Sequence, residues 1–354
     1  MNSQERAGQH LPASFESTAM FREAASASAA VRAQFALDTD AIQAIGAQIR
    51  ELAPRTVITC ARGSSDHAAT YAKYLIETRA RIPTASAALS ISSVYGIRQD
   101  LRQCLYVAIS QSGRSPDLLA SVALAKESGA TVLAICNSPD APLNAGADHV
   151  IALRAGPEQS VAATKSYLAT LAAVARFVAA WTSDAGLDED LARLPDLMDE
   201  AWPMDWTSAV NMLAGAEHLY VVGRGLGLAA AQEIALKCKE TCGLHAEAFS
   251  SAELRHGPFT LLGPNFPALL LTQDDATQPG VVALAAELAK SGVRVLLAGA
   301  DAKGAVQLPS LACPAALAPI LLAQSAYRCI GQLAFRRGFN PDFPAHLRKI
   351  TETV

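Results

Sequence analysis

The stretch KETCGLHAEAFSSAELRHGP, residues 239–258, gathers many side chains capable of chemistry in twenty positions. It holds two histidines, three glutamates, a lysine and an arginine, although only 18% of the 354 residues are charged. Three kinds of site fit such a set: a metal centre, a turn held by ion pairs, or an acid–base centre. The spacing of the residues and the elements that carry them must decide among these.

A metal centre requires partner ligands that the sequence does not supply. His245 and Glu247 match half of the zinc deaminase pattern, but no P-C-x-x-C follows. Glu253 and His256 have the spacing of one half of a di-iron site, yet no second E-x-x-H exists. The close cysteine pair 238–242 lacks further ligands at zinc-finger spacing. We therefore expect neither a metal nor a cofactor.

The residues preceding this stretch predict a helix over 227–241. Glu233, Lys237 and Glu240 then share one helical face, at positions i, i+4 and i+7. One interpretation is a solvated face of ion pairs. The other is that Lys237 and Glu240 project into a cleft and act on a ligand. The spacing alone leaves both open.

A second cluster of polar residues indicates anion binding. SQSGRSPD, residues 110–117, offers the hydroxyls of Ser110, Ser112 and Ser115, with Gly113 allowing the backbone to curl. Such a loop before a helix holds a phosphate with neutral donors and the helix N-terminus. GSS at 63–65 has the same character. An ordinary turn with N-capping serines is the alternative for either loop alone.

Two nucleotide-binding patterns fit poorly. The P-loop sequence G-x-x-x-x-G-K-[ST] is absent. GRGLG at 223–227 begins like a dinucleotide fingerprint, but Leu228 stands where the third glycine belongs. We therefore expect no nucleotide cofactor.

The elements that must position these residues alternate along the chain. Short apolar runs at 55–63, 104–112 and 130–138 read as buried parallel strands. Longer alanine-rich segments at 64–80 and 116–129 read as helices. This alternation predicts a doubly wound parallel α/β sheet, with both serine loops at the carboxyl edge where such sheets bind ligands.

The same order of elements returns in the second half. Arg224 lies 162 positions after Arg62, and Gln273 lies 162 after Gln111. A third segment, LAKSGVRVLLAG, resembles LAKESGATVLAIC, and its Ser291 lies 163 positions after Ser128. We infer two tandem copies of one fold, joined by an acidic linker around 182–202. Only the first copy keeps the serine loop, which assigns anion binding to it.

Composition narrows the range of partners. The net charge is −4 and no basic stripe exists, so nucleic acid is not expected. The N-terminus lacks the pattern of a signal peptide, and no apolar run is long enough to cross a membrane. A cytoplasmic protein without a membrane partner is the expectation.

Six motifs together resemble the isomerase half of glucosamine-6-phosphate synthases, which is built from two sugar-isomerase (SIS) domains. They are GSSDHA, SQSGRSPD, AGPEQSVAATKS, ALKCKE, HAEAFSSAELRHGP and NPDFPAHLRKITETV. The resemblance runs from about residue 20 to the end and implies flavodoxin-like three-layer αβα domains. The predicted parts are an N-terminal helical segment at 1–34, SIS domains at 35–190 and 200–339, and an active-site tail at 340–354.

The resemblance also implies which residues bind substrate. The positions that match the family's sugar-phosphate ligands are Ser65, Ser110, Gln111, Ser112 and Ser115. Val161 matches a main-chain contact to the sugar. Ala163 departs from the family, which often has serine there, and this puts one hydroxyl contact in doubt.

Four residues match catalytic positions of the family. Glu240 would move a proton between C1 and C2, with Lys237 lining the sugar site. His256 would open the sugar ring from the neighbouring subunit, which implies a homodimer with a shared site. Lys349 would form a Schiff base with the ketose. Glu247 and Glu253 are interpreted as structural, holding the loop through hydrogen bonds.

The expected reaction is conversion of glucosamine-6-phosphate to fructose-6-phosphate and ammonia. Only about 35 residues precede the first SIS copy, so no glutaminase domain is expected, and closest to this arrangement are stand-alone SIS-type deaminases. Alternatives are a deglycase acting on fructosamine-6-phosphates, and an isomerase-domain-only relative of the glutamine–fructose-6-phosphate transaminase. A non-enzymatic sugar-phosphate sensor is a further alternative.

Overall fold

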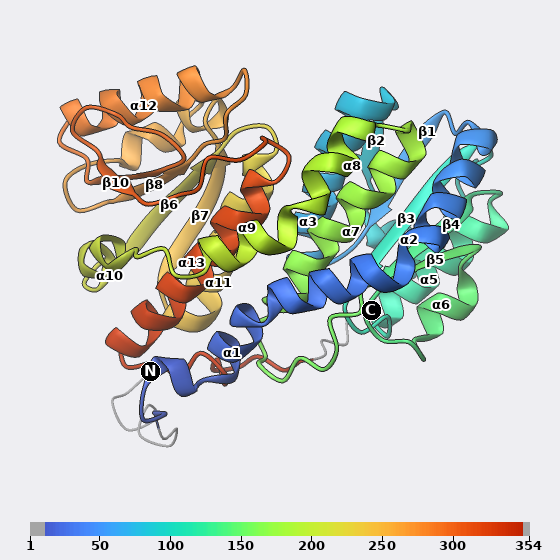
Figure 1. Cartoon of the computed structure of the whole chain (residues 1–354), viewed down its shortest axis with the longest axis horizontal. Helices are drawn as coiled ribbons and strands as arrows, with labels where there is room; N and C mark the ends of the chain where they lie inside the picture. The colour runs from blue at the N-terminus through green and yellow to red at the C-terminus, as the bar shows by residue number, and fades with distance from the viewer. Residues whose placement is uncertain (1–10, 350–354) are drawn as a thin grey trace. The chain divides into compact units, whose positions relative to one another are not determined.

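A computed structural model describes residues 11–349, which divide into two compact units (Figure 1). The unit named the first domain contains Ala27–Pro157 and Lys165–Asp196. The second domain contains Leu197–Lys349 together with Glu158–Thr164 and the segment that ends at Ser26. The domain boundaries expected from the sequence remain predictions.

The first domain is built on a parallel five-stranded sheet of order β2-β1-β3-β4-β5. The three strands predicted from the sequence form its centre, and two short strands form its edges. Their bounds are β1 (Thr56–Cys60), β2 (Thr84–Ser86), β3 (Cys104–Ser110), β4 (Thr131–Cys136) and β5 (His149–Ala152). All seven residues of β3 are buried, as expected for a strand covered on both faces.

Helices pack on both faces of this sheet. The predicted helix at 64–80 is confirmed as α3 followed by a π-helical turn, and the one at 116–129 is confirmed as α5. The helices are α2 (Ala27–Leu52), α3 (Ser64–Leu75), α4 (Leu89–Ser93), α5 (Pro116–Glu127), α6 (Pro142–Gly146), α7 (Lys165–Thr182) and α8 (Ala185–Ala192). Helix α7 is apolar around nearly its whole circumference because α2 and α3 cover it.

The second domain repeats this plan. Its sheet has the order β10-β9-β8-β6-β7, all parallel. The strands are β6 (His218–Gly223), β7 (His245–Ser250), β8 (Ala268–Leu271), β9 (Val295–Ala298) and β10 (Val306–Leu308). In both sheets the first strand in the chain lies between the second and third, so the duplication read from the sequence is confirmed.

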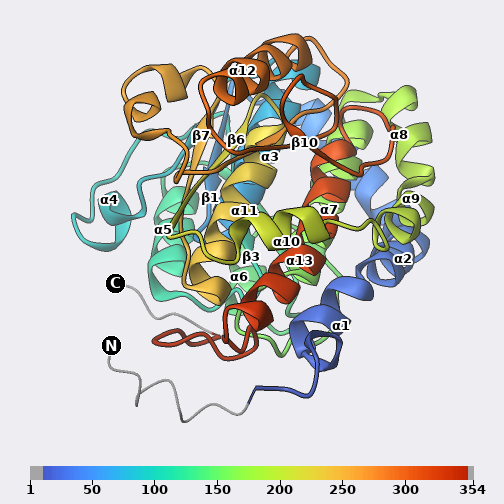
Figure 2. The same cartoon turned by 90° about the vertical axis from the view of Figure 1, so that its left-hand side faces the viewer.

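Helices also surround the second sheet. They are α1 (Ala19–Ala25), α9 (Leu194–Ala201), α10 (Thr207–Leu213), α11 (Gly227–Cys242), α12 (Gln278–Lys290) and α13 (Ala318–Arg336). Helices α11 and α13 lie side by side in Figures 1 and 2. Right-handed crossovers place α11 and α12 on opposite faces of the sheet, because the chain moves in opposite directions after β6 and β8.

The predicted linker around 182–202 contains a boundary between the two units, which falls between Asp196 and Leu197, and most of it is helical. Residues 185–201 form α8 and α9 with a single-residue break. Leu187 and Leu191 are buried one helical turn apart, and Leu194 and Met198 repeat this spacing. The acidic residues of the segment face solvent, so its polar composition concealed an amphipathic pattern.

Within residues 11–349, no helix combines the length and the apolar character needed to cross a membrane. The apolar run at 308–323 instead contains the end of β10, an irregular segment and the start of α13.

Candidate active site

The serine loop of the first domain lies where the direction of chain winding reverses. Strand β1 lies between β2 and β3 in the sheet. The connection after β1 therefore runs to β2 on one side, and the next connection crosses back to β3 on the other side. Ser65 lies in the first turn of α3 after β1, and Ser110 ends β3. Crevices at such reversals are the usual ligand sites of open α/β sheets. The sequence-predicted phosphate ligands are therefore brought to one sheet edge.

Gly113 gives this loop its shape. Its φ is +62°, and a Cβ there would lie 2.5 Å from the Cβ of Ala141 and 2.8 Å from the Sγ of Cys136. The Gly113 N–H donates to Ser110 Oγ over 2.9 Å. Only glycine satisfies both the positive φ and the close approach.

A salt bridge supports the two strand ends. Arg62, after β1, donates from Nε and Nη2 to Asp117 Oδ2, at 3.0 Å in each case. The Asp117 side chain is fully buried in the first turn of α5, and its Oδ1 accepts from the Leu118 N–H over 2.8 Å. The two helices that begin at this edge are thus tied together.

Four half-buried polar side chains near this sheet edge have no hydrogen-bond partner within the described part of the chain. Ser65, Gln111, Ser112 and Ser115 are all half-buried, and none of these side chains hydrogen-bonds to another described residue. Ser115 is the N-cap residue of α5, yet its hydroxyl does not cap the helix. N-capping therefore does not explain this serine, and its hydroxyl is available to a ligand.

In the second domain, helix α11 carries a buried group of three charges. Lys237 Nζ lies 2.5 Å from Glu240 Oε2 and 3.4 Å from Glu233 Oε1. The side chains of Glu233 and Lys237 are 0% and 1% exposed, whereas that of Glu240 is 20% exposed. Tyr327, on α13, donates its hydroxyl to Glu233 over 2.9 Å. The interpretation of this face as a solvated ion-pair surface is therefore wrong.

The charge state of Lys237 follows from its neighbours. Burial alone would lower the pKa of its ammonium, but Glu233 and Glu240 outweigh burial and raise the pKa above 10.5. Lys237 is consequently a cation at neutral pH. It fixes the Glu240 carboxylate at the accessible end of the group.

The loop after β7 is organised by its backbone. Residues Glu253–Arg255 and Pro258–Leu261 form two short 3₁₀ helices, and the Arg255 side chain pairs with Glu287 over 2.5 Å. Glu247 and Glu253 are exposed and make no side-chain hydrogen bond to another described residue. The interpretation that these two carboxylates hold the loop was wrong, because the 3₁₀ turns satisfy the backbone themselves.

His256 lies in this loop and is exposed. It is the C-cap residue of the first 3₁₀ helix, where its N–H donates to the Glu253 carbonyl over 2.9 Å. Its ring faces solvent in the single chain. A role in ring opening requires the ring to meet a substrate, and that stays a prediction.

Lys349 is anchored rather than solvated. Its Nζ lies 3.1 Å from Glu158 Oε2 and donates to the Ser160 carbonyl over 2.7 Å. The Glu158 side chain is fully buried, and its other oxygen accepts from the Thr164 N–H. Lys349 is therefore held against the loop that contains Val161, whose own N–H faces the Asp342 carbonyl at 3.4 Å.

Glu23 supports the same loop from α1. It accepts hydrogen bonds from the N–H groups of Gln159 and Ser160. Burial raises the pKa of its carboxyl, and nearby Glu158 adds to the rise. Glu23 and Glu158 were not singled out from the sequence, although Glu158 lies within the motif AGPEQSVAATKS.

The described contacts therefore form three groups: the serine loop, the Glu233–Lys237–Glu240 group, and the Lys349–Glu158 group with its loop. Sequence reasoning missed Tyr327, because no spacing signal connects it to α11. Within residues 11–349, no cluster of three or more metal-ligating side chains occurs.

Duplicated doubly wound domains, with a lysine-free serine loop at one reversal point, define a tandem α/β protein with a candidate ligand site in its first domain. The SIS domain family matches residues 53–180 and 212–303. Because these segments make up more than half of the chain, the chain belongs to the SIS-domain family.

Relatives agree with this placement. The chain is 32% identical over 336 residues to the glutamine–fructose-6-phosphate aminotransferase (isomerizing) of Pseudomonas putida, covering 88% of this chain and 54% of the relative. A crystal structure of a candidate phosphosugar isomerase from Silicibacter pomeroyi shares 36% identity at TM-score 0.89, covering 92% of this chain and all of that one.

A further structure is the C-terminal domain of glucosamine-fructose-6-phosphate aminotransferase from Francisella tularensis, with 25% identity and TM-score 0.84. It covers 93% of this chain and 98% of that one. The chain spans about half the length of the curated relatives that it matches.

Proposed function

We propose that this chain is a phosphosugar isomerase of the deaminase type, which converts glucosamine-6-phosphate and water to fructose-6-phosphate and ammonia. The observation that carries the proposal is the Glu240 carboxylate, partly exposed and held at 2.5 Å by a buried lysine. A carboxylate fixed in this way suits repeated proton transfer at one place.

The proton transfer between the two carbons requires one base. Once the sugar ring is open, Glu240 takes the proton from C2 and returns it to C1, while the amine nitrogen gives up one proton and O1 gains one. The aldehyde and amine thereby become an alcohol at C1 and an imine at C2. Water then adds to C2, the carbon–nitrogen bond breaks, and ammonia leaves. The products are fructose-6-phosphate and ammonia, and no oxidant or second substrate besides water is needed.

The serine loop supplies the other half of recognition. Ser65, Ser110, Gln111, Ser112 and Ser115 are proposed to bind the phosphate and the neighbouring sugar hydroxyls. Neutral hydroxyls and the N-terminus of α5 hold a dianion without an ion pair. We propose that Val161 contributes a main-chain contact from its loop.

His256 and Lys349 are proposed to act on the open chain. An imidazole near neutral pH can carry the proton between the anomeric hydroxyl and the ring oxygen. Lys349 forms an imine only after its ammonium loses a proton and leaves Glu158. Borohydride treatment with fructose-6-phosphate would trap such an imine on Lys349, and the Lys349→Met variant should trap none.

The reaction is tested by incubating the purified chain with glucosamine-6-phosphate and no glutamine. Fructose-6-phosphate and ammonia should appear in equal amounts. Glu240→Gln should lower kcat by about 10²–10⁴-fold, the usual contribution of a general base. Glu247→Gln is the matched control, because Glu247 is an exposed glutamate on β7, and it should retain full activity.

Other outcomes decide between the alternatives. If the chain turns over amino-acid fructosamine-6-phosphates in preference to glucosamine-6-phosphate, its activity is that of a deglycase and not of a deaminase. Thermal stabilisation by sugar phosphates without any turnover would indicate a sensor. Full activity in Glu240→Gln would overturn the assignment of the base.

The proposed homodimer has its own test. If His256 serves the partner's substrate, mixtures of the inactive His256→Ala and Glu240→Gln proteins should recover about a quarter of wild-type activity, because random pairing restores one site in each mixed dimer. Recovery should fail if His256 acts within its own chain.

A further inference from the structure

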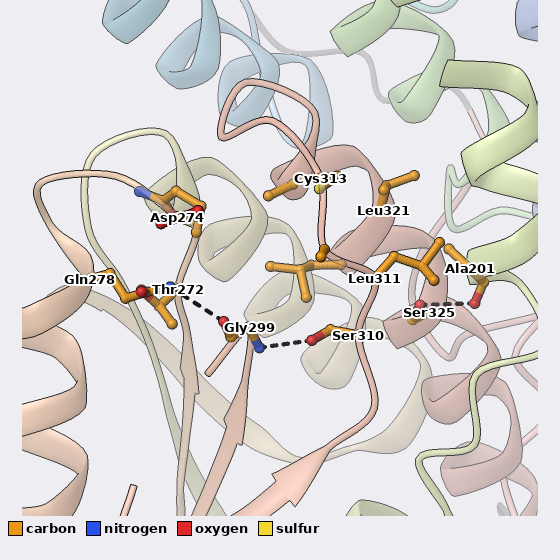
Figure 3. Close-up of a pocket in the computed structure, with 14 residues that line it drawn as sticks. Ala201, Thr272, Asp274, Gln278, Gly299, Ser310, Leu311, Cys313, Leu321 and Ser325 are labelled. Carbon is orange, nitrogen blue, oxygen red and sulfur yellow. Dashed lines mark hydrogen bonds between the residues drawn. The ribbon is translucent and has the colours of Figure 1, made fainter. Parts of the chain in front are cut away.

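The second domain contains a cavity of about 280 Å³ that the proposed reaction does not use. It lies at the carboxyl ends of β8 and β9 (Figure 3). Thr272 and Gly299 form its floor, segment 310–313 forms one wall, and Leu321 on α13 forms another. The volume is near the lower end for ligand sites and suits a molecule the size of one sugar.

The cavity walls are fixed. Gly299 has a φ of +97°, and a Cβ there would lie 1.9 Å from the Thr272 carbonyl oxygen, so the two strand ends approach as closely as glycine allows. The Gly299 N–H donates to Ser310 Oγ over 3.1 Å. Trp206 Nε1 donates to the Pro309 carbonyl over 2.8 Å, which holds the start of the wall segment. These contacts hold the cavity walls in place, so the cavity is a fixed feature of the second domain.

The lining is polar on one side and carries one carboxylate. Thr272 is only 2% exposed, and its Oγ1 has no hydrogen-bond partner within residues 11–349. Gln278 and Ser310 add an amide and a hydroxyl. Asp274 is exposed at the rim, and no lysine or arginine is among the described lining residues. A phosphate would therefore meet a negative charge and no cation.

The first domain carries different side chains at the duplicated position. Thr272 and Asp274 stand 162 positions after Ser110 and Ser112. The hydroxyl at the strand end is retained, whereas the second hydroxyl has become a carboxylate. Because a carboxylate binds ammonium groups and repels phosphate, the change alters the charge of the ligand that the position favours.

We propose that this cavity binds a small, polyhydroxylated amine without a phosphate group, with its ammonium at Asp274 and its hydroxyls toward Thr272 and Ser310. The site is separate from the proposed reaction and does not depend on it. An unphosphorylated hexosamine has the required size and charge, and glucosamine is the probe.

Cys313 provides the readout. It lines the cavity and is half-buried, whereas the other six cysteines are buried. Alkylation by iodoacetamide, followed by peptide mass spectrometry, should therefore modify Cys313 first. Glucosamine should slow this modification saturably. Glucose and glucose-6-phosphate should each protect about tenfold less well, because they lack the ammonium.

Two variants separate this site from the proposed active site. Asp274→Asn should weaken protection by glucosamine about tenfold, while the matched control Asp301→Asn, at another exposed carboxylate, should leave it unchanged. Both should keep wild-type turnover and melting temperature. Thr272→Val should weaken protection without lowering the melting temperature, since its hydroxyl has no internal partner.

Three results would overturn the proposal: no saturable protection by glucosamine, equal protection in Asp274→Asn, or equal protection by glucose or glucose-6-phosphate. None of these bears on whether the chain deaminates glucosamine-6-phosphate, which the product assay measures separately.

Discussion

The two reversal points of the chain have the same backbone plan and opposite polar chemistry. At β1/β3 the side chains of Ser65, Gln111 and Ser112 make no hydrogen bond to another described residue. At β6/β8 the side chain of Gln273 donates to the Arg224 carbonyl over 3.0 Å and to Asp275 over 2.8 Å. The first copy leaves the side chain of Gln111 available to a ligand, whereas the second uses the amide N–H groups of Gln273 in internal hydrogen bonds.

The same contrast extends to the first helix of each copy. Residues 162 positions before Glu233 and Lys237 are Tyr71 and Leu75, both fully buried on α3. The second copy therefore carries a buried ion group where the first has an ordinary core. Duplication supplied the scaffold, and each copy has specialised a different part of it.

The largest expected effect comes from breaking the buried ion group. Lys237→Met removes the cation between Glu233 and Glu240 and leaves the buried Glu233 carboxylate without its neighbouring cation, although Tyr327 still donates to it. We expect a loss of about 3–5 kcal/mol in the free energy of unfolding, measured by urea denaturation. Leu75→Met, at the duplicated position, is the matched control and should cost less than about 1.5 kcal/mol. Equal losses would contradict the contrast between the two helices.

Next in size is the loss of Gly113. Gly113→Ala combines a positive φ with a Cβ that overlaps Ala141, and should cost about 2–4 kcal/mol together with weaker sugar-phosphate binding. Gly225→Ala has φ +58° but meets no atom closer than 3.4 Å, so strain alone should cost about 1–2 kcal/mol. Calorimetric melting and titration with fructose-6-phosphate measure both quantities.

The paired glutamines give a smaller effect with opposite signatures. Gln111→Ala should change stability by less than about 0.5 kcal/mol while raising the KM for glucosamine-6-phosphate. Gln273→Ala should cost about 1–3 kcal/mol, because it removes a buried side chain and the hydrogen bonds that it donates to partly buried acceptors, with unchanged kinetics. If both variants altered only stability, the assignment of the first loop to substrate would be wrong.

The smallest expected effect is a change with pH in the difference in unfolding free energy between wild type and Lys237→Met. Because the folded-state pKa of Lys237 is raised, its stabilising contribution is fully present below the unfolded pKa of about 10.5. That contribution declines as the pH rises through the folded value. The difference in unfolding free energy between wild type and Lys237→Met should be constant from pH 7 to about 10 and narrow above it. If the difference in unfolding free energy already narrows below about pH 9, the pKa of Lys237 in the folded state is not raised, and the prediction is contradicted.

Much of this organisation can be predicted from the sequence, because central strands and loop glycines leave strong local signals. The runs around β1, β3 and β4 are apolar on both faces, and Gly113 marks its own turn. The short edge strands β2, β5 and β10 were missed because only one residue of each is buried, whereas the equally short β8 and β9 are apolar and buried throughout. Such segments form strands only because a neighbouring strand offers its hydrogen bonds.

The burial of the charged residues on α11 could not be predicted from the sequence. The spacing of Glu233, Lys237 and Glu240 is the same on a solvated helix and on a buried one. What decides between them is α13, some ninety residues further along, where Tyr327 covers Glu233. For the same reason, the anchor of Lys349 on Glu158 depends on a contact across 191 positions that no local pattern records.

The cluster around Lys349 also constrains the order in which the molecule is made. Asp342 accepts hydrogen bonds from the N–H groups of Ala19 and Met20, across more than 320 positions. During synthesis, Ala19 and Met20 can form these hydrogen bonds only after Asp342 has left the ribosome. All helices and strands of the first domain have already emerged by Asp196. Folding from the N-terminus can complete that domain first, and the closure of the second domain becomes a late, long-range step that translation itself delays.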